Sequence, residues 1–228
     1  MRLDVKNNEI TKFDFEHPLK ATILKLLPVS IVLSSYTGYM DDDNIELGID
    51  LDHSNVKLIS LGYTMVLSKI DSGMTVDLRI KMSDSVFEYV PHPLILGRSS
   101  RLSQITRIEM CDLSTLLYLD SFVIGRVHMK ESFQFESLNT KCTLKINNEL
   151  VLFEKSKLVP DNIEFRPFEV YGTLILVNYT KSFETVHTKE LSLVANKINY
   201  QDKQIGQIIR IGALSSDFFW NTIQNMIY

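Results

Sequence analysis

Two carboxylates lie in otherwise apolar segments of the chain. Asp120 interrupts the run LLYLDSFVI, residues 116–124, and Glu154 follows the apolar residues 150–153. Burying a carboxylate is unfavourable unless it is paired or faces water. Arg126, just beyond the first run, is one candidate partner for Asp120. The two carboxylates therefore predict either structural ion pairs or polar groups that line an internal channel or an interface. A third interpretation is an acid/base pair, which requires a separation of about 5 to 10 Å and a ligand-sized pocket.

Other chemistry-bearing residues are dispersed. The five histidines, His17, His53, His92, His128 and His187, stand singly, and neither Cys111 nor Cys142 has a close His or Cys neighbour in sequence. A dedicated zinc or nickel cage usually shows such spacing. The sequence also lacks the nucleophile-elbow, zincin, phosphate-loop and dinucleotide-binding motifs. We therefore expect no permanent cofactor and no enzymatic activity, and favour a role in binding or assembly.

The composition excludes several classes of partner. The 228 residues include 24 Lys and Arg against 28 Asp and Glu, a net charge of -4, which gives no electrostatic footprint for nucleic acid. The first residues are charged and the longest apolar runs are too short to span a bilayer, so we expect no membrane association. Two cysteines without a signal segment favour reduced thiols and a cytoplasmic location.

The elements that position these residues read mainly as β-strands. Residues 75–81 alternate strictly between apolar and polar, and residues 140–146 repeat the pattern before Asn147-Asn148 and a second apolar segment, which predicts a hairpin. Many short strands separated by turn residues indicate stacked or sandwiched sheets in one domain, residues 1–228. The further strand candidates are residues 23–34, 45–51, 56–59, 65–68, 86–90, 102–110, 116–124, 132–136, 172–178, 191–195 and 205–211.

One clear helix is predicted at the C-terminal end. Ser215, Ser216 and Asp217 provide capping groups, and Phe219, Ile223 and Ile227 recur every four residues. A second short helix is expected near residue 184.

A basic segment precedes the strand that carries Asp120. Arg101 and Arg107 fall on one face of the predicted strand 102–110, together with Ser103 and Ile105. Such a face is either solvated or buried against a partner.

Residues 87–93, FEYVPHP, resemble the aromatic-x-Pro-x-Pro signature of the urease accessory protein D/H family. In that family the signature precedes an Arg-rich strand, a hydrophobic strand with Asp that ends in Gly-Arg, and a Glu-x-Phe strand. The corresponding segments here are residues 101–107, 116–126 and 131–133, and further similarities lie at residues 150–158, 172–174 and 210–217. The family's early glycine-rich loop is reduced to residues 38–43, and the chain is short for the family.

The resemblance implies a non-catalytic scaffold for urease maturation. Members dock on apo-urease and recruit the helical accessory protein F, which engages the GTPase accessory protein G that carries nickel. Nickel in transit would then follow an internal route. The implied fold is mainly β, with stacked or helically wound antiparallel and mixed sheets and a C-terminal helix. The alternatives are a small β-scaffold hydrolase with paired carboxylates, or an interaction protein of the same fold unrelated to urease. The residues assigned to nickel transit are Asp120 and Glu154, and those assigned to docking or structure are Pro91, Pro93, Arg101, Arg107 and Arg126.

Overall fold

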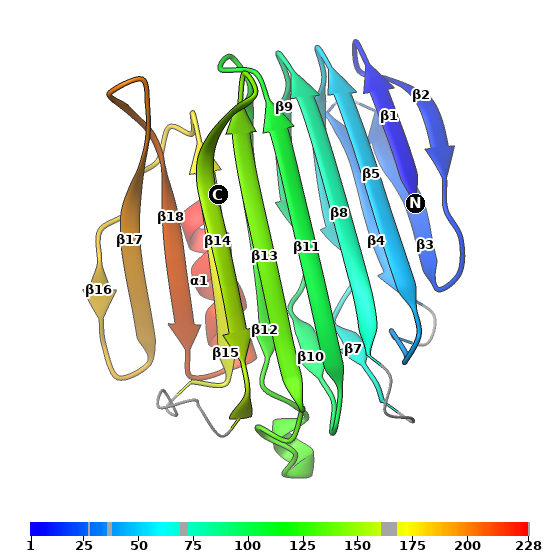
Figure 1. Cartoon of the computed structure of the whole chain (residues 1–228), viewed down its shortest axis with the longest axis vertical. Coiled ribbons are helices and arrows are strands. Elements are labelled where there is room, and N and C mark those ends of the chain that lie inside the picture. The colour runs from blue at the N-terminus through cyan, green and yellow to red at the C-terminus, as the bar shows by residue number, and fades with distance from the viewer. Residues whose placement is uncertain (27, 36–37, 69–72, 161–167, 228) are drawn as a thin grey trace.

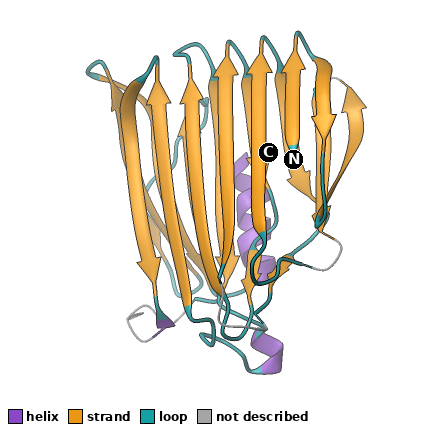
Figure 2. Cartoon of the chain, turned by 45° about the vertical axis from the view of Figure 1, so that its right-hand side comes forward, coloured by secondary structure: helices purple, strands orange, loops and turns teal. Residues whose placement is uncertain are grey.

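The computed structural model describes residues 1–26, 28–35, 38–68, 73–160 and 168–227, which form two facing β-sheets and a C-terminal helix (Figures 1 and 2). The sheet nearer the viewer in Figure 1 is called the front sheet, and the other the back sheet. In spatial order the front sheet holds β14 (Glu149–Leu158), β13 (Ser137–Ile146), β11 (Arg101–Met110), β8 (Met74–Ser83), β5 (Asn44–Asp52), β1 (Arg2–Lys6) and β2 (Glu9–Asp14).

The back sheet is the larger of the two. In spatial order it holds β16 (Val186–His187), β17 (Leu191–Tyr200), β18 (Lys203–Ala213), β15 (Val170–Val177), β12 (Thr115–Val123), β9 (Val86–Val90), β6 (Asn55–Ser60), β4 (Val29–Ser35) and β3 (Leu19–Leu26). Two short strands extend this sheet at the end of β12: β10 (Leu94–Leu96) pairs with β12, and β7 (Thr64–Val66) pairs with β10. A 3₁₀ turn, Val127–Met129, follows β12.

The middle of the chain winds between the sheets. Successive strands β5, β6, β8, β9, β11, β12 and β13 alternate between front and back, and neighbours within each sheet run parallel. Antiparallel pairs flank this wound region, namely β1 with β2, β3 with β4, β13 with β14, and β15 and β17 with β18. The predicted mainly β architecture with mixed, helically wound sheets is confirmed.

Period-2 patterning places one face of each strand in the core. In β8 the apolar residues from Met74 to Met82 are buried, whereas Asp77 and Arg79 point out of the front sheet. The predicted hairpin is also confirmed, because Asn147 and Asn148 adopt φ angles of 48° and 67° between β13 and β14. Asparagine tolerates this left-handed region, which a two-residue hairpin turn requires at both positions.

The helix α1 (Ser216–Ile227) forms as predicted. The backbone N–H of Phe218 donates to Ser215 Oγ (3.3 Å), and Phe219, Ile223 and Ile227 are buried on one face. This face packs on the outer side of the back sheet, so the molecule has one apolar core between the sheets and a second beneath α1. Gly172 permits the approach, since a Cβ there would lie 2.9 Å from the Phe219 ring.

Three local predictions are wrong. Residues 23–34 form two paired strands, β3 and β4, because Pro28 has no N–H to donate to a sheet ladder. Residues 132–136 are irregular, with Phe133 at a φ of 57°, which no strand accommodates. Glu184 lies in a loop before β16 and not in a helix. Strands β1 and β2 were not predicted.

Candidate functional site

Asp120 points into the space between the two sheets. Along β12, Leu116 and Tyr118 belong to the core between the sheets, whereas Leu117 and Leu119 belong to the core beneath α1. Strand alternation gives Asp120 the same direction as Tyr118. The predicted carboxylate within an apolar strand therefore faces the space between the sheets, where it is half-buried.

The partners of Asp120 are neutral groups. Its carboxyl group accepts hydrogen bonds from the Gln104 side chain, on β11 of the front sheet, and from the backbone amide of Ser121. Burial raises the pKa of Asp120 from its ordinary value of 3.8 to about 6, against the opposing effect of these bonds, and the nearby charge of Glu154 raises it further. A cation that approached this carboxylate would relieve the cost of burying its negative charge.

Arg126 is not the partner of Asp120. Its Nε and Nη2 donate to the two carboxylate oxygens of Glu131, at 2.5 and 2.6 Å. The pair forms because β12 ends at Val123 and the chain turns back through the 3₁₀ turn, which brings residue 131 beside residue 126. The predicted pairing of Arg126 with Asp120 is thus wrong.

Glu154 faces the same interior from β14. In the register of the hairpin it lies opposite Cys142, and Arg210 of β18 donates to its Oε1 from Nε (3.2 Å) and lies near it through Nη2 (3.1 Å). The other oxygen, Oε2, is buried and has no hydrogen-bond partner among the described residues. The Arg210 side chain is 53% exposed and that of Glu154 17%, so the guanidinium lies at the rim and the carboxylate behind it.

One cavity of about 190 Å³ joins the two carboxylates. Asp120, Glu154 and Arg210 line it from β12, β14 and β18, together with the polar residues Gln104, Thr106, Tyr118, Thr140, Cys142, Ser156 and Thr173. Its wall is held by a hydrogen bond between the hydroxyls of Thr106 and Tyr118 (2.9 Å), which crosses from one sheet to the other. Burial raises the pKa of the Cys142 thiol to about 12, so this group stays protonated at neutral pH.

A smaller cavity of about 50 Å³ lies on the other side of Asp120. Gln104 and Asp120 line both cavities, so this hydrogen-bonded pair forms part of the wall of each chamber. The smaller chamber is lined further by Tyr39, Tyr89 and His92, among mostly apolar side chains.

The remaining predicted residues lie apart from this interior. Arg101 and Arg107 share the outer face of the front sheet, as predicted, where Arg101 pairs with Glu136 (2.6 Å) and Arg107 with Asp77 (2.5 Å). The connection from β9 to β10 holds both prolines, with Pro93 buried and Pro91 on the wall of the smaller chamber.

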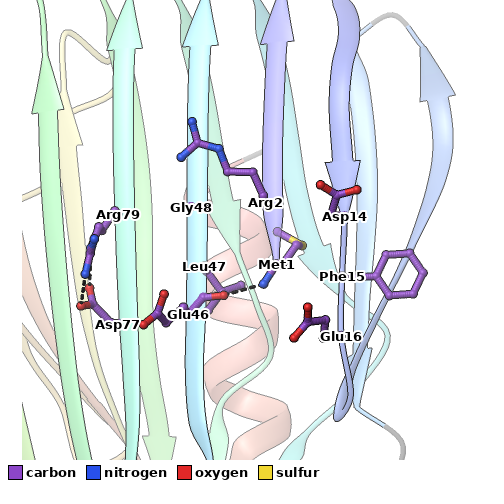
Figure 3. Close-up of a pocket in the computed structure, with 10 residues that line it drawn as sticks. All are labelled: Met1, Arg2, Asp14, Phe15, Glu16, Glu46, Leu47, Gly48, Asp77 and Arg79. Atoms are coloured by element: carbon purple, nitrogen blue, oxygen red, sulfur yellow. Dashed lines mark hydrogen bonds and ion pairs between the residues drawn. The ribbon is translucent and has the colours of Figure 1, made fainter.

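The outer face of the front sheet carries a larger hollow of about 380 Å³ (Figure 3). Arg79 donates to Asp77 within the hollow (2.9 Å), and Arg2 donates to the neighbouring Asp50. Figure 3 shows Glu46 between the Asp77–Arg79 pair and Met1. The Met1 amino group donates to the Glu46 backbone carbonyl (2.5 Å). This hollow is open to solvent and none of its carboxylates is buried within the sandwich.

The whole arrangement lies within one recognised family. The sequence matches the model of the UreD urease accessory protein family over residues 8–216. The chain belongs to this family. The match includes the back sheet, the front sheet apart from β1, and the residues that line the interior cavities, and it confirms the resemblance drawn from residues 87–93 and the segments that follow them.

Individual UreD and UreH proteins are also similar to this chain. The urease accessory protein UreD of Actinobacillus pleuropneumoniae serotype 7 (strain AP76) is 25% identical over 184 residues, 76% of this chain and 68% of that protein. UreD of Haemophilus influenzae (strain ATCC 51907 / DSM 11121 / KW20 / Rd) is 32% identical over 153 residues, 65% and 58% of the two chains. UreH of Helicobacter hepaticus (strain ATCC 51449 / 3B1) is 27% identical over 132 residues, 57% and 52%.

The described residues of this UreD-family chain hold no group of three or more His, Cys, Asp or Glu side chains placed to bind a metal ion together. Within the same residues, no helix has the length and apolarity needed to cross a membrane.

Sequence reasoning missed two residues of the interior. Gln104 occupies an inward position of β11, between the buried Leu102 and Thr106. The alternation of inward and outward residues along 101–110 would have identified it. Arg210 interrupts the apolar run IIRIG of β18, the same signal that marked Asp120.

Proposed function

We propose that this UreD-family chain is a non-catalytic scaffold for urease maturation in the cytoplasm. It docks on apo-urease and recruits the helical accessory protein F, which engages the GTPase accessory protein G. It then helps to deliver nickel to the urease active site. Membership in the UreD family supports the urease accessory role, and the names of the A. pleuropneumoniae and H. influenzae relatives agree with it.

We further propose that nickel passes through the polar interior of this chain. The observation that carries this step is that Asp120 and Glu154 line one cavity and that Asp120 also lines the smaller chamber. Carboxylate oxygens suit a divalent cation, and a route must bind an ion weakly at successive points so that it can leave. Isolated carboxylates in series, without a closed metal cage among the described residues, fit this requirement.

The paired-carboxylate hydrolase is disfavoured. Asp120 and Glu154 do share a cavity, but its volume of about 190 Å³ falls below the roughly 300 to 1,000 Å³ of small-molecule sites. Arg210 also occupies one oxygen of Glu154 at the rim. A sugar or peptide would not reach both carboxylates without displacing this ion pair.

The route is tested by Asp120→Ala in cells that express the matching urease operon. We expect normal assembly with urease but nickel content and activity of urease reduced by about tenfold, a loss typical of removing a group around a bound metal. Asp50→Ala is the matched control, because it removes an outer-face carboxylate that pairs with Arg2 and with none of the proposed docking residues. Unchanged nickel loading with normal assembly would refute the route, and insolubility would point to a structural role for Asp120.

Docking is tested separately by co-purification of the tagged chain. Recovery of urease subunits together with accessory proteins F and G is the expected result. The proposed docking or structural residues remain Pro91, Pro93, Arg101, Arg107 and Arg126. Comparing Arg107→Ala, on the front sheet, with Arg126→Ala, just after β12 of the back sheet, tests which of the two sheets contributes to docking. Recovery of the chain alone would contradict the assembly role.

A further inference from the structure

His92 is held rigidly at the wall of the smaller chamber. The two flanking prolines fix their own φ angles, and the backbone N–H of His92 donates to Ser60 Oγ (2.7 Å). The imidazole ring stacks on Trp220 of α1, with ring centroids 4.0 Å apart and planes 21° apart, and Tyr63 meets its edge. The imidazole is thus positioned by contacts from two segments, residues 60–63 and α1.

The hydrogen bonding of the ring selects one tautomer. Nδ1 lies 3.1 Å from the backbone carbonyl oxygen of Ser60, which only accepts, so Nδ1 carries the proton and donates it. Nε2 is then left with a lone pair, and no described residue hydrogen-bonds it. Metal-binding histidines commonly have this arrangement, in which the far nitrogen donates to a backbone carbonyl.

The charge state of the ring suits the same role. Burial lowers the pKa of His92, so the imidazole is neutral at pH 7 and its Nε2 lone pair is available. Its chamber also contains Asp120 and has room for an ion with very few water molecules, since one water needs about 10 to 15 Å³. Imidazole is a good ligand for nickel.

We propose that His92 Nε2 is a transient nickel ligand in the smaller chamber, whose wall also includes Asp120. This inference rests on the proposed function and extends it from two carboxylates to a series of three donors, an imidazole and two carboxylates. Imidazole suits nickel, so His92 would hold the ion within this chamber.

Trp220 provides a direct test, because it is the single tryptophan of the chain and stacks on His92. Nickel bound to His92 would quench its fluorescence. Titration of the full-length chain with NiCl₂, with its partners where they are needed for solubility, should give saturable quenching. His92→Phe keeps an aromatic ring on Trp220 but removes the ligand, and should weaken apparent nickel affinity by about tenfold or more. His187→Phe, at an exposed histidine on β16, controls for surface binding.

The outcomes separate this inference from the route itself. Equal quenching in wild type and His92→Phe would overturn the role of His92, while loss of urease nickel loading in Asp120→Ala would still uphold the route. Normal loading in both variants would overturn both proposals. Should His92→Phe fail to fold, nickel titration of wild-type protein labelled with ¹⁵N-histidine decides the matter. Selective broadening of the His92 imidazole signals supports the ligand, and its absence refutes it.

Discussion

Two aspartates on opposite sides of the sandwich experience opposite environments. Asp77, on the outer face of the front sheet, is bound by the guanidinium groups of Arg79 and Arg107, which lower its pKa. Asp120, between the sheets, has only neutral hydrogen-bond donors, and burial raises its pKa to about 6. The larger hollow lies beside Asp77, but Asp120 is the carboxylate whose negative charge has no cationic partner. Cavity size is therefore a poorer guide to a cation site here than the balance of charge around each carboxylate.

Asparagine substitutions should give opposite effects on stability, the largest effect expected from this comparison. The rise in the pKa of Asp120 from 3.8 to about 6 corresponds to about 3 kcal/mol of penalty for its charged form. Native Asp120 holds its proton where the unfolded chain has lost it, so this group makes stability fall as pH rises from about 4 to 6. Asp120→Asn should remove that slope and be up to about 3 kcal/mol more stable than wild type at pH 7.5.

Asp77→Asn should behave in the reverse sense. The lowered pKa means that the stabilising contribution of Asp77 is present at neutral pH and is lost on acidification through its folded-state pKa. Because its arginine partners are largely exposed, the loss at pH 7.5 should be below about 1 kcal/mol. Urea denaturation between pH 4 and 8 measures both variants. Parallel pH profiles for Asp120→Asn and wild type would contradict the buried, uncompensated carboxylate.

The hydrogen bond between Thr106 and Tyr118 should contribute less to stability than the change expected for Asp120→Asn. Tyr118→Phe removes the hydroxyl that bonds Thr106 across the two sheets and should cost about 1 kcal/mol. Thr106→Val should cost a similar amount, and the double variant little more than either, because both remove the same bond. Denaturation of the four proteins gives the coupling energy. Strict additivity would mean that this bond does not connect the sheets.

Much of the fold was predictable because the strands are regular. The alternation of residues 75–81 and 140–146 and the Asn147-Asn148 turn follow from local patterning, and α1 from its four-residue repeat. The break at Pro28 was missed because the turn interrupts an apolar run, and residues 132–136 were missed because SFQFE alternates like a strand although Phe133 adopts a left-handed φ of 57°. Strand β1, RLDVK, alternates between polar and apolar residues but is only five residues long, whereas β2, EITKFD, does not alternate.

The candidate site was predictable only in part. Asp120 and Glu154 stood out as charges within apolar segments, and both do line the interior. Their partners did not stand out, because pairing across sheets depends on the winding of the chain. Gln104 precedes Asp120 by only 16 residues in sequence but belongs to the other sheet, and Arg210 reaches Glu154 from β18. The nearest basic residue in sequence, Arg126, was consequently the wrong choice.

The smallest expected effect concerns the communication between the two interior carboxylates. The charge of Glu154 contributes to the raised pKa of Asp120, so Glu154→Gln should lower that pKa below about 6. Freed Arg210 would act in the same direction, so the double variant Glu154→Gln/Arg210→Gln isolates the effect of the carboxylate. Carboxyl ¹³C NMR titration measures the change, with Asp77→Asn as the outer-face control. An unaltered Asp120 pKa in both Glu154 variants would mean that the two groups do not act on a shared ion, and a cation would then meet them as independent sites.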